Sequence, residues 1–340
     1  NAKSTMFIIN NNSYKGVINM NNFKKIGLSA LAGSLAAFSA NAGEMTVSGG
    51  ANIYMTATNE LNKTTYSMDD HVTFSGSGEL DNGMTVTYSL QLDGDEADDG
   101  VVDNHSIKID TNGSGTITYG GHGTDTVMAG WDDKTPNAYE EAWDIVDTNG
   151  STSGGTPTVI NGVSANSMFI YTSPSFSGAT LTSSYLPQGG AAGQETNLDF
   201  AIAISPEGID GLTMGAAISS NTNGGGDDVD ETTAYLSYAM GSFTFGMQTS
   251  DYDSSVANSD LESIAYGLTY AVNDDFSIGY SYHELETETS GDGDQESTGI
   301  SASYTMGGMT LAGASNESLN LGGTTTTDVE GYEFTLSFAF

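Results

Sequence analysis

The last ten residues of this 340-residue chain, 331–340, constrain its fold more than any other segment. Side chains along an extended strand alternate between its two faces. One face here holds only large apolar residues, and the other holds small or polar ones: Tyr332, Phe334, Leu336, Phe338 and Phe340 against Glu333, Thr335, Ser337 and Ala339. At an open sheet edge in water, such a strand would aggregate. The pattern predicts that the apolar face meets lipid and that the strand closes a β-barrel, which has no open edge.

The same alternation recurs along the chain. Residues 84–92, 197–204, 264–270 and 276–282 each place large apolar side chains on one face and small or polar side chains on the other. Alternation alone does not distinguish a membrane barrel from a soluble sandwich, because a sandwich buries the same apolar row. The choice between them depends on the connections.

Short and long connections alternate along the sequence. Tight turns rich in Gly, Asn and Asp, such as 81–83, 241–242 and 273–275, suit β-hairpins. The long connections are acidic or rich in Gly, Ser and Thr: 57–64, 94–103, 122–165, 187–195, 221–230, 251–260, 286–296 and 317–328. One long loop per hairpin predicts an all-β, transmembrane antiparallel β-barrel of about 16 strands, with tight turns at one rim and long loops at the other.

The chain is strongly acidic, with 44 Asp and Glu against 7 lysines and no arginine. All the acidic residues follow Gly43, where only Lys63, Lys108 and Lys134 oppose them. Such a surface repels nucleic acid and attracts cations. Disorder is the alternative for so charged a chain, but its 17 Tyr and 13 Phe lie in alternating segments rather than in polar tracts. The absence of cysteine excludes disulfides and thiolate metal sites.

The N-terminal region has the features of a secretory signal peptide. Residues 20–25 include two lysines, an apolar stretch follows at 26–38, and Ala40-Asn41-Ala42 provides a cleavage site. The apolar stretch is shorter than the roughly 20 residues that a transmembrane helix needs. We therefore expect a signal peptide at 20–42, a barrel domain at 43–340, and an upstream, non-native extension at 1–19.

From about Glu44 to Phe340, with its alternating terminal aromatics and final Phe340, the chain resembles the outer-membrane general porins of Gram-negative bacteria, particularly the Rhodobacter-type (alphaproteobacterial) trimeric porins. This resemblance implies a homotrimer in the outer membrane, surrounded by lipid and lipopolysaccharide. It also implies that the barrel-assembly machinery reads the C-terminal strand, with Tyr332 and Phe338 as further parts of the signal. Val47 to Ala51 would lie at the subunit contact.

The longest loop, 122–165, follows an expected strand at 115–121 and contains Trp131 and Trp143. It also includes a helix-compatible stretch at 137–146, and loops of this length are usually functional. The resemblance implies that this third external loop folds into the lumen and narrows it. The constriction would then include Asp132, Asp133, Glu140, Glu141, Asp144 and Asp147. The alternative is that several of these residues only solvate the loop surface.

Members of the family often place arginines on the wall opposite this loop, and this chain has none. Lys108, which lies between Ile107 and Ile109, should point into the lumen from the fourth strand. Lys134 lies within the loop itself. Because acidic side chains around a pore favour cations, we expect a cation-preferring channel.

Acidic clusters in other loops suggest weak Ca²⁺ binding, since Ca²⁺ prefers several oxygen ligands. The candidate ligands are Asp93, Asp95, Asp227, Asp228, Asp230, Asp292 and Asp294. None of these clusters completes the EF-hand pattern. The alternative, that the charges keep the outer rim soluble, is the more common role, and no other cofactor is expected.

The sequence contains no recognisable catalytic motif, and its four histidines are scattered. We therefore predict a non-enzymatic, water-filled channel for passive diffusion of small hydrophilic solutes and ions. Two alternatives stay open from the sequence. One is a secreted, acidic, β-rich, calcium-dependent adhesin or surface-layer protein, and the other is a substrate-specific outer-membrane channel.

Overall fold

The computed structural model describes residues 42–58, 63–94, 102–143, 159–187, 194–223, 228–288, 293–323, 325 and 328–340. The expected extension at 1–19 and the expected signal peptide, apart from Ala42, lie outside these residues. Across the part of the chain that is described, no helix is both long enough and apolar enough to cross a membrane.

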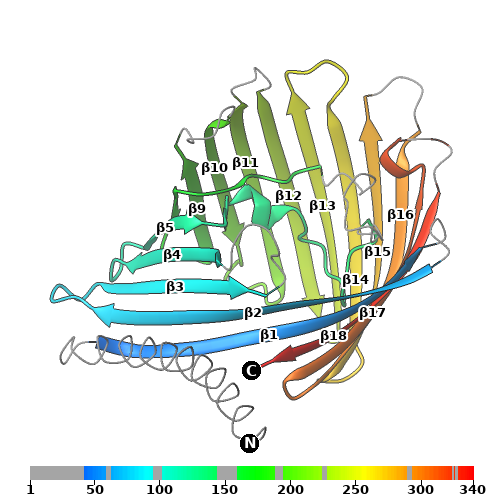
Figure 1. Ribbon diagram of the computed structural model, residues 1–340. Helices are drawn as coiled ribbons and strands as arrows, with labels where there is room; N and C mark the ends of the chain where they lie inside the picture. The colour runs from blue at the N-terminus through cyan, green and yellow to red at the C-terminus, as the bar shows by residue number, and fades with distance from the viewer. Residues whose placement is uncertain are drawn as a thin grey trace, which may run out of the picture.

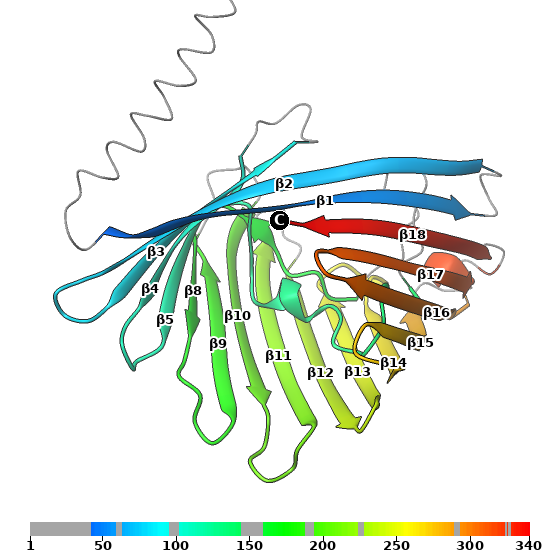
Figure 2. The ribbon, with the colours of Figure 1, turned by 90° about the horizontal axis from the view of Figure 1, so that it is seen from below.

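Sixteen antiparallel strands form one closed barrel, which confirms the predicted fold class (Figures 1 and 2). The barrel strands are β1 (Ala42–Thr58), β2 (Lys63–Glu79), β3 (Thr85–Asp93), β4 (Val102–Asp110), β5 (Thr116–His122), β8 (Met168–Thr172), β9 (Ala179–Leu186), β10 (Gln194–Ile204), β11 (Leu212–Asn223), β12 (Val229–Met240), β13 (Phe243–Ser254), β14 (Leu261–Ala271), β15 (Phe276–Thr287), β16 (Gln295–Met306), β17 (Met309–Leu319) and β18 (Val329–Ala339). Four short elements are not part of the barrel wall: β6 (Thr124–Asp125), β7 (Ser164–Ala165) and the 3₁₀ helices η1 (Met128–Trp131) and η2 (Leu321–Gly323).

The C-terminal strand closes the barrel, as its sequence predicts. β18 pairs with β1 from Gly50 opposite Ala339 to Thr58 opposite Gly331. At the end of the chain, Gly49 N donates to Phe340 O at 2.8 Å and Phe340 N donates to Gly49 O at 3.0 Å. Every strand of the barrel therefore has a partner on both sides, and the barrel sheet has no free edge.

The two faces of β18 differ as the alternation predicts. The outward side chains of Tyr332, Phe334 and Phe338 are 43%, 48% and 38% exposed. The inward side chains of Glu333 and Thr335 are only 8% and 4% exposed, because other parts of the chain cover them inside the barrel. The apolar row therefore faces the surroundings of the barrel, and the polar row faces the lumen.

Outward-facing carboxylates replace the apolar residues toward the end of the barrel that holds the long loops. Several of them face one another across neighbouring strands, such as Asp251 opposite Glu262 and Glu317 opposite Glu330. We call this set the acidic belt: Asp230, Asp251, Asp253, Glu262, Glu284, Glu286, Glu296, Glu317 and Glu330. Like charges placed opposite one another in a sheet repel, so this rim is suited to water, salt and polar head groups rather than to hydrocarbon.

Tight turns join the strands at the other end of the barrel. β12 connects to β13 through Gly241-Ser242, and β16 connects to β17 through Gly307-Gly308. Gly241 has φ +61° and Gly307 has φ +63°, in the left-handed region where a side chain would be strained. Short turns at this end of the barrel thus alternate along the chain with long loops at the other end.

Candidate functional site: the loop folded against the barrel wall

The long loop after β5 folds into the barrel, as the sequence analysis expected. Its two ends lie together because β6 pairs with β7, with Thr124 opposite Ala165. Residues 127–139 of the loop run along the inside of the wall from β9 toward β18 (Figure 2). The loop therefore occupies part of the lumen.

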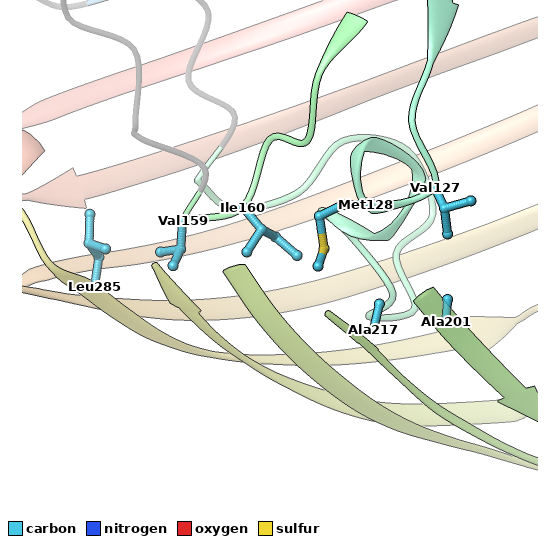
Figure 3. Close-up of a cluster of buried hydrophobic side chains, with 7 residues drawn as sticks. All are labelled: Val127, Met128, Val159, Ile160, Ala201, Ala217 and Leu285. Carbon is cyan, nitrogen blue, oxygen red and sulfur yellow. The ribbon is translucent and has the colours of Figure 1, made fainter. Parts of the chain in front are cut away.

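An apolar cluster holds the base of the loop against the wall (Figure 3). The loop contributes Val127, Met128, Val159 and Ile160, and the wall contributes Ala201, Ala217 and Leu285. Small inward residues on β10 and β11 thus give the larger loop side chains room to pack. Burying such side chains contributes about 1.5–3 kcal/mol each, so this base is firmly attached.

Polar contacts continue the attachment beyond the base. Gln248 on β13 accepts a hydrogen bond from Lys134 N at 2.6 Å and donates one to Trp131 O at 2.7 Å. Ser301 on β16 accepts one from Ala138 N at 3.2 Å. These contacts satisfy backbone groups of the loop through the wall, which lets the loop stay extended.

The helix-compatible stretch at 137–146 does not form a helix over its described residues, 137–143. The one helical turn of the described loop lies earlier, at η1. Wall contacts oppose the helix, because Asn316 on β17 donates to Glu141 O at 2.7 Å, a carbonyl that a helix would pair with the amide four residues later. Tertiary hydrogen bonding here overrides local helix propensity.

Inward-facing glycines form a track for the loop. We call this set the glycine track: Gly215, Gly246, Gly267, Gly279 and Gly299, one each from β11, β13, β14, β15 and β16. A Cβ on Gly215 would lie 2.6 Å from Cη2 of Trp131, and one on Gly279 would lie 2.8 Å from Ala138 N. Real Cβ atoms do not approach so closely, so the absence of side chains lets the loop lie flat on the wall. The glycine track was not predicted from the sequence, although each of these glycines is an inward residue between two outward-facing ones in its strand.

The far end of the loop is fixed by aromatic residues. The Tyr139 hydroxyl hydrogen-bonds to both Glu333 and Thr335 on β18. Burial, reinforced by the hydrogen bond to Glu333, raises the pKa of Tyr139, so the hydroxyl keeps the proton that it donates. Trp143 lies against His283 on β15, with 4.6 Å between ring centroids. The loop therefore has anchors at both ends of its path.

The predicted constriction acids have different environments. Asp132 is exposed, whereas Glu140 is half-buried. Asp133 accepts hydrogen bonds from Thr135 N at 2.9 Å and from Asn137 Nδ2 at 3.1 Å. Asp144 and Asp147 lie outside the described residues.

Glu141 joins Asp133 in a carboxyl pair inside the loop. Its side chain accepts a hydrogen bond from Asn137 Nδ2 at 3.0 Å and is hydrogen-bonded to Asp133. Burial, and then the hydrogen bond to Asp133, raise the pKa of Glu141 well above the usual range for a carboxyl group. A shared proton therefore links the pair, which stabilises the shape of the loop.

The two predicted lysines occupy different parts of the lumen. Ile107 on β4 faces outward, so its neighbour Lys108 faces inward, opposite Thr87 on β3 and Thr118 on β5. Lys134 Nζ lies 5.9 Å from the centroid of the Trp131 ring, a cation–π distance. One positive charge is thus on the wall, and the other stays with the loop.

Among the described residues, no group of three or more His, Cys, Asp and Glu is placed to hold a metal ion. The described candidates for Ca²⁺ are Asp93, Asp228, Asp230 and Asp294, and the others, Asp95, Asp227 and Asp292, lie outside the described residues. Weak Ca²⁺ binding by the acidic loops stays a prediction.

Comparison with known proteins identifies the family. The profile of the Gram-negative porins matches residues 27–338, and a search of curated proteins found no match. Among solved structures, a loop-deletion mutant of OmpT, an outer membrane protein of Vibrio cholerae, has 14% identity and a TM-score of 0.69, covering 88% of this chain and 100% of its own.

Two further solved structures share the fold. An anion-selective porin from Comamonas acidovorans has 15% identity and a TM-score of 0.64, covering 87% of this chain and 99% of its own. A mutant of the Rh. blastica porin has 17% identity and a TM-score of 0.60, covering 87% and 100%. The family match covers most of the sequence, and the barrel has the matching architecture. The chain therefore belongs to the Gram-negative porin family, and its barrel is an outer-membrane porin channel.

Proposed function

We propose that this porin passes small hydrophilic solutes and ions by passive diffusion and that it prefers cations. The observation that carries the proposal is the acidic loop inside the barrel, with Asp132 exposed on it. The lumen is otherwise lined by the polar, inward-facing rows of the strands. Water fills such an interior, and the width and fixed charge of the lumen then determine which solutes pass.

The balance of charge in the lumen supports a preference for cations. Lys108 is exposed on the inward face of β4, while Lys134 lies against Trp131 on the loop. No arginine exists in the chain to extend this positive side. Acidic side chains near a constriction concentrate cations and repel anions.

The fold itself does not determine the sign of the preference. The Comamonas porin shares the architecture and is described as anion-selective. Selectivity in this chain must therefore come from its own side chains, of which Asp132 is the exposed carboxylate on the part of the loop that lies along the wall.

Reversal potentials across planar bilayers in a KCl gradient test the proposal. We expect a potential of the sign that K⁺ permeation produces, and a smaller one in Asp132→Asn. Glu262→Gln is the matched control, because it removes one charge from the acidic belt on the outside of the barrel. A potential of zero or of the opposite sign in the unmodified protein would refute cation preference, whereas saturable conductance block by one solute would indicate a substrate-specific channel.

The proposal extends to assembly as a homotrimer in lipid and lipopolysaccharide, with the C-terminal strand read by the barrel-assembly machinery. The short outward residues Gly49 and Ala51 on β1 are compatible with close approach of a second copy. Deletion of Phe340 removes both terminal hydrogen bonds to Gly49. We expect this deletion to reduce the yield of heat-modifiable, folded barrel in membranes, and an unchanged yield would contradict the proposed signal.

A further inference from the structure

Four polar residues form a buried row beneath the base of the loop. Ser184, Asp199, Ser219 and Glu231 are in register across β9, β10, β11 and β12. They are 1%, 0%, 4% and 5% exposed, and Asn197, two residues before Asp199 on the same inward face, is 1% exposed. Two carboxylates thus lie about 10 Å apart at the backbone, two strand spacings, with Ser219 between them.

Two oxygen atoms, one in this row and one on the adjacent Asn197, have no hydrogen-bond partner. Asp199 Oδ2 accepts from Met128 N at 2.8 Å and from Ser184 Oγ at 3.0 Å, but Asp199 Oδ1 accepts from no group. Asn197 Nδ2 donates to Ser219 Oγ at 3.0 Å, and Asn197 Oδ1 is likewise without a partner. Buried acceptors without partners are rare in folded proteins and indicate a missing ligand or water.

The charge of the row is also uncompensated. Glu231 accepts hydrogen bonds from the backbone of Asn161 at 3.0 Å and of Gly162 at 3.3 Å. Neither Asp199 nor Glu231 forms an ion pair with another described residue. Removing two carboxylates from water without a nearby positive charge is costly.

We propose that a Ca²⁺ ion binds in this row, held by Asp199 Oδ1, Asn197 Oδ1 and the carboxylate of Glu231, with the Ser219 hydroxyl beside it. These are hard oxygen ligands of the kind that Ca²⁺ prefers, and water completes its coordination. Two carboxylates match the charge of a divalent ion. The site differs from the acidic surface loops, because it is buried and two of its oxygens are otherwise unsatisfied.

The position of this site makes the base of the loop depend on the ion. Asp199 holds Met128 on the outgoing part of the loop, and Glu231 holds Asn161 and Gly162 on the returning part. The apolar cluster in Figure 3, which includes Met128 and Ile160, covers the same region. A bound ion would therefore fix both parts of the loop to the wall.

Equilibrium dialysis of the purified protein in detergent against Ca²⁺ tests the proposal. We expect one tight, saturable site per chain that is not displaced by equimolar Mg²⁺, distinct from any weak binding by the acidic loops. This site should be absent in Asp199→Asn and retained in Glu262→Gln, which changes only the acidic belt. Chelation should lower the melting temperature of the unmodified protein and of Glu262→Gln, but not that of Asp199→Asn.

A second variant keeps the test decisive if Asp199→Asn does not fold. Asn197→Asp supplies a further carboxylate at the same position, and we expect it to bind Ca²⁺ more tightly, by about tenfold, because affinity rises with the charge of the ligands. Equal Ca²⁺ binding in the unmodified protein, Asp199→Asn and Asn197→Asp would overturn the proposal. The absence of saturable Ca²⁺ binding in the unmodified protein would also overturn it, because only water or a proton would then occupy the row. Reversal potentials are a separate measurement, so cation preference and this site can fail independently.

Discussion

Replacement of a glycine in the glycine track should release the loop from the wall, and Gly246→Ala is the most informative case. A Cβ on Gly246 would lie 3.3 Å from Pro136 Cγ and nearer still to Cδ. On Gly267, the register partner of Gly246, the added Cβ would also lie 3.0 Å from Pro136 Cδ, but its nearest contacts are backbone atoms, Pro136 N at 2.9 Å and, nearer still, Pro136 O. Two neighbouring glycines thus meet the same proline, one mainly through its ring carbons and the other mainly through its backbone.

The expected cost follows from this overlap. Inserting a methyl group into a closely packed contact typically costs about 1–3 kcal/mol, and the wall cannot move away because it is a paired sheet. A change of this size in loop attachment corresponds to an increase of about 5- to 150-fold in the population of the released loop. Gly130→Ala is the control within the loop, since its added Cβ would meet nothing within 4 Å.

A single introduced cysteine can measure the released population. The chain has no cysteine, and Thr135 on the loop is buried. In a common Thr135→Cys background, a small thiol reagent should label the protein only when the loop opens. When the loop recloses faster than the reagent reacts, the labelling rate follows the open population.

The outcome that tests the reasoning is a selective rescue. Adding Pro136→Ala removes Cδ and should restore slow labelling in Gly246→Ala, but it should not do so in Gly267→Ala, where backbone atoms are in the way. If Gly246→Ala labels no faster than Gly130→Ala, or if Pro136→Ala rescues both variants equally, then the glycines do not position the loop by steric fit.

Three further predictions concern the same loop. Tyr139→Phe should accelerate labelling of Thr135→Cys by about tenfold or more, because hydrogen bonds to charged groups contribute about 1.5–3 kcal/mol; unchanged labelling would mean that this anchor adds no stability. The raised pKa of Glu141 means that the docked loop binds more protons than the released loop, so attachment should be strongest at acidic pH and weaken as pH rises above about 4.3. Labelling normalised to an exposed cysteine should show this trend, and Glu141→Gln should flatten it. Finally, Gly279→Ala should also accelerate labelling of Thr135→Cys, because its added Cβ would lie 2.8 Å from Ala138 N and 3.3 Å from the Ala138 Cβ; labelling no faster than in Gly130→Ala would contradict the steric fit at this position.

The strands could be predicted from the sequence because one constraint acts on every one of them. Along the middle of each strand the outer row is mostly large and apolar and the lumen-facing row is mostly small or polar, so segments such as Phe276 to Tyr282 show a period of two. The same alternation in the terminal residues 331–340 predicted that the last strand closes the barrel. The position of the loop followed from its length and from the resemblance to porins, rather than from its own pattern.

The detailed attachment of the loop could not be predicted from the sequence. Tyr139 meets Glu333 across 194 positions of sequence, and that contact depends on how far the loop extends inside the barrel. The inward glycines look like any small lining residue until the loop is placed on them. Likewise, Asp199 and Glu231 resemble ordinary lumen carboxylates in the sequence, and only the covering loop makes them buried.

The acidic belt has a consequence for how the barrel stays in place. Its carboxylates project outward at the rim that holds the long loops, including the facing pairs of Asp251 with Glu262 and Glu317 with Glu330. To slip back through the bilayer, the barrel would have to drag these ionised groups through hydrocarbon, where each is strongly disfavoured. The belt therefore opposes withdrawal of the finished barrel toward the side that holds the tight turns, and it helps to fix the depth of the barrel in the membrane.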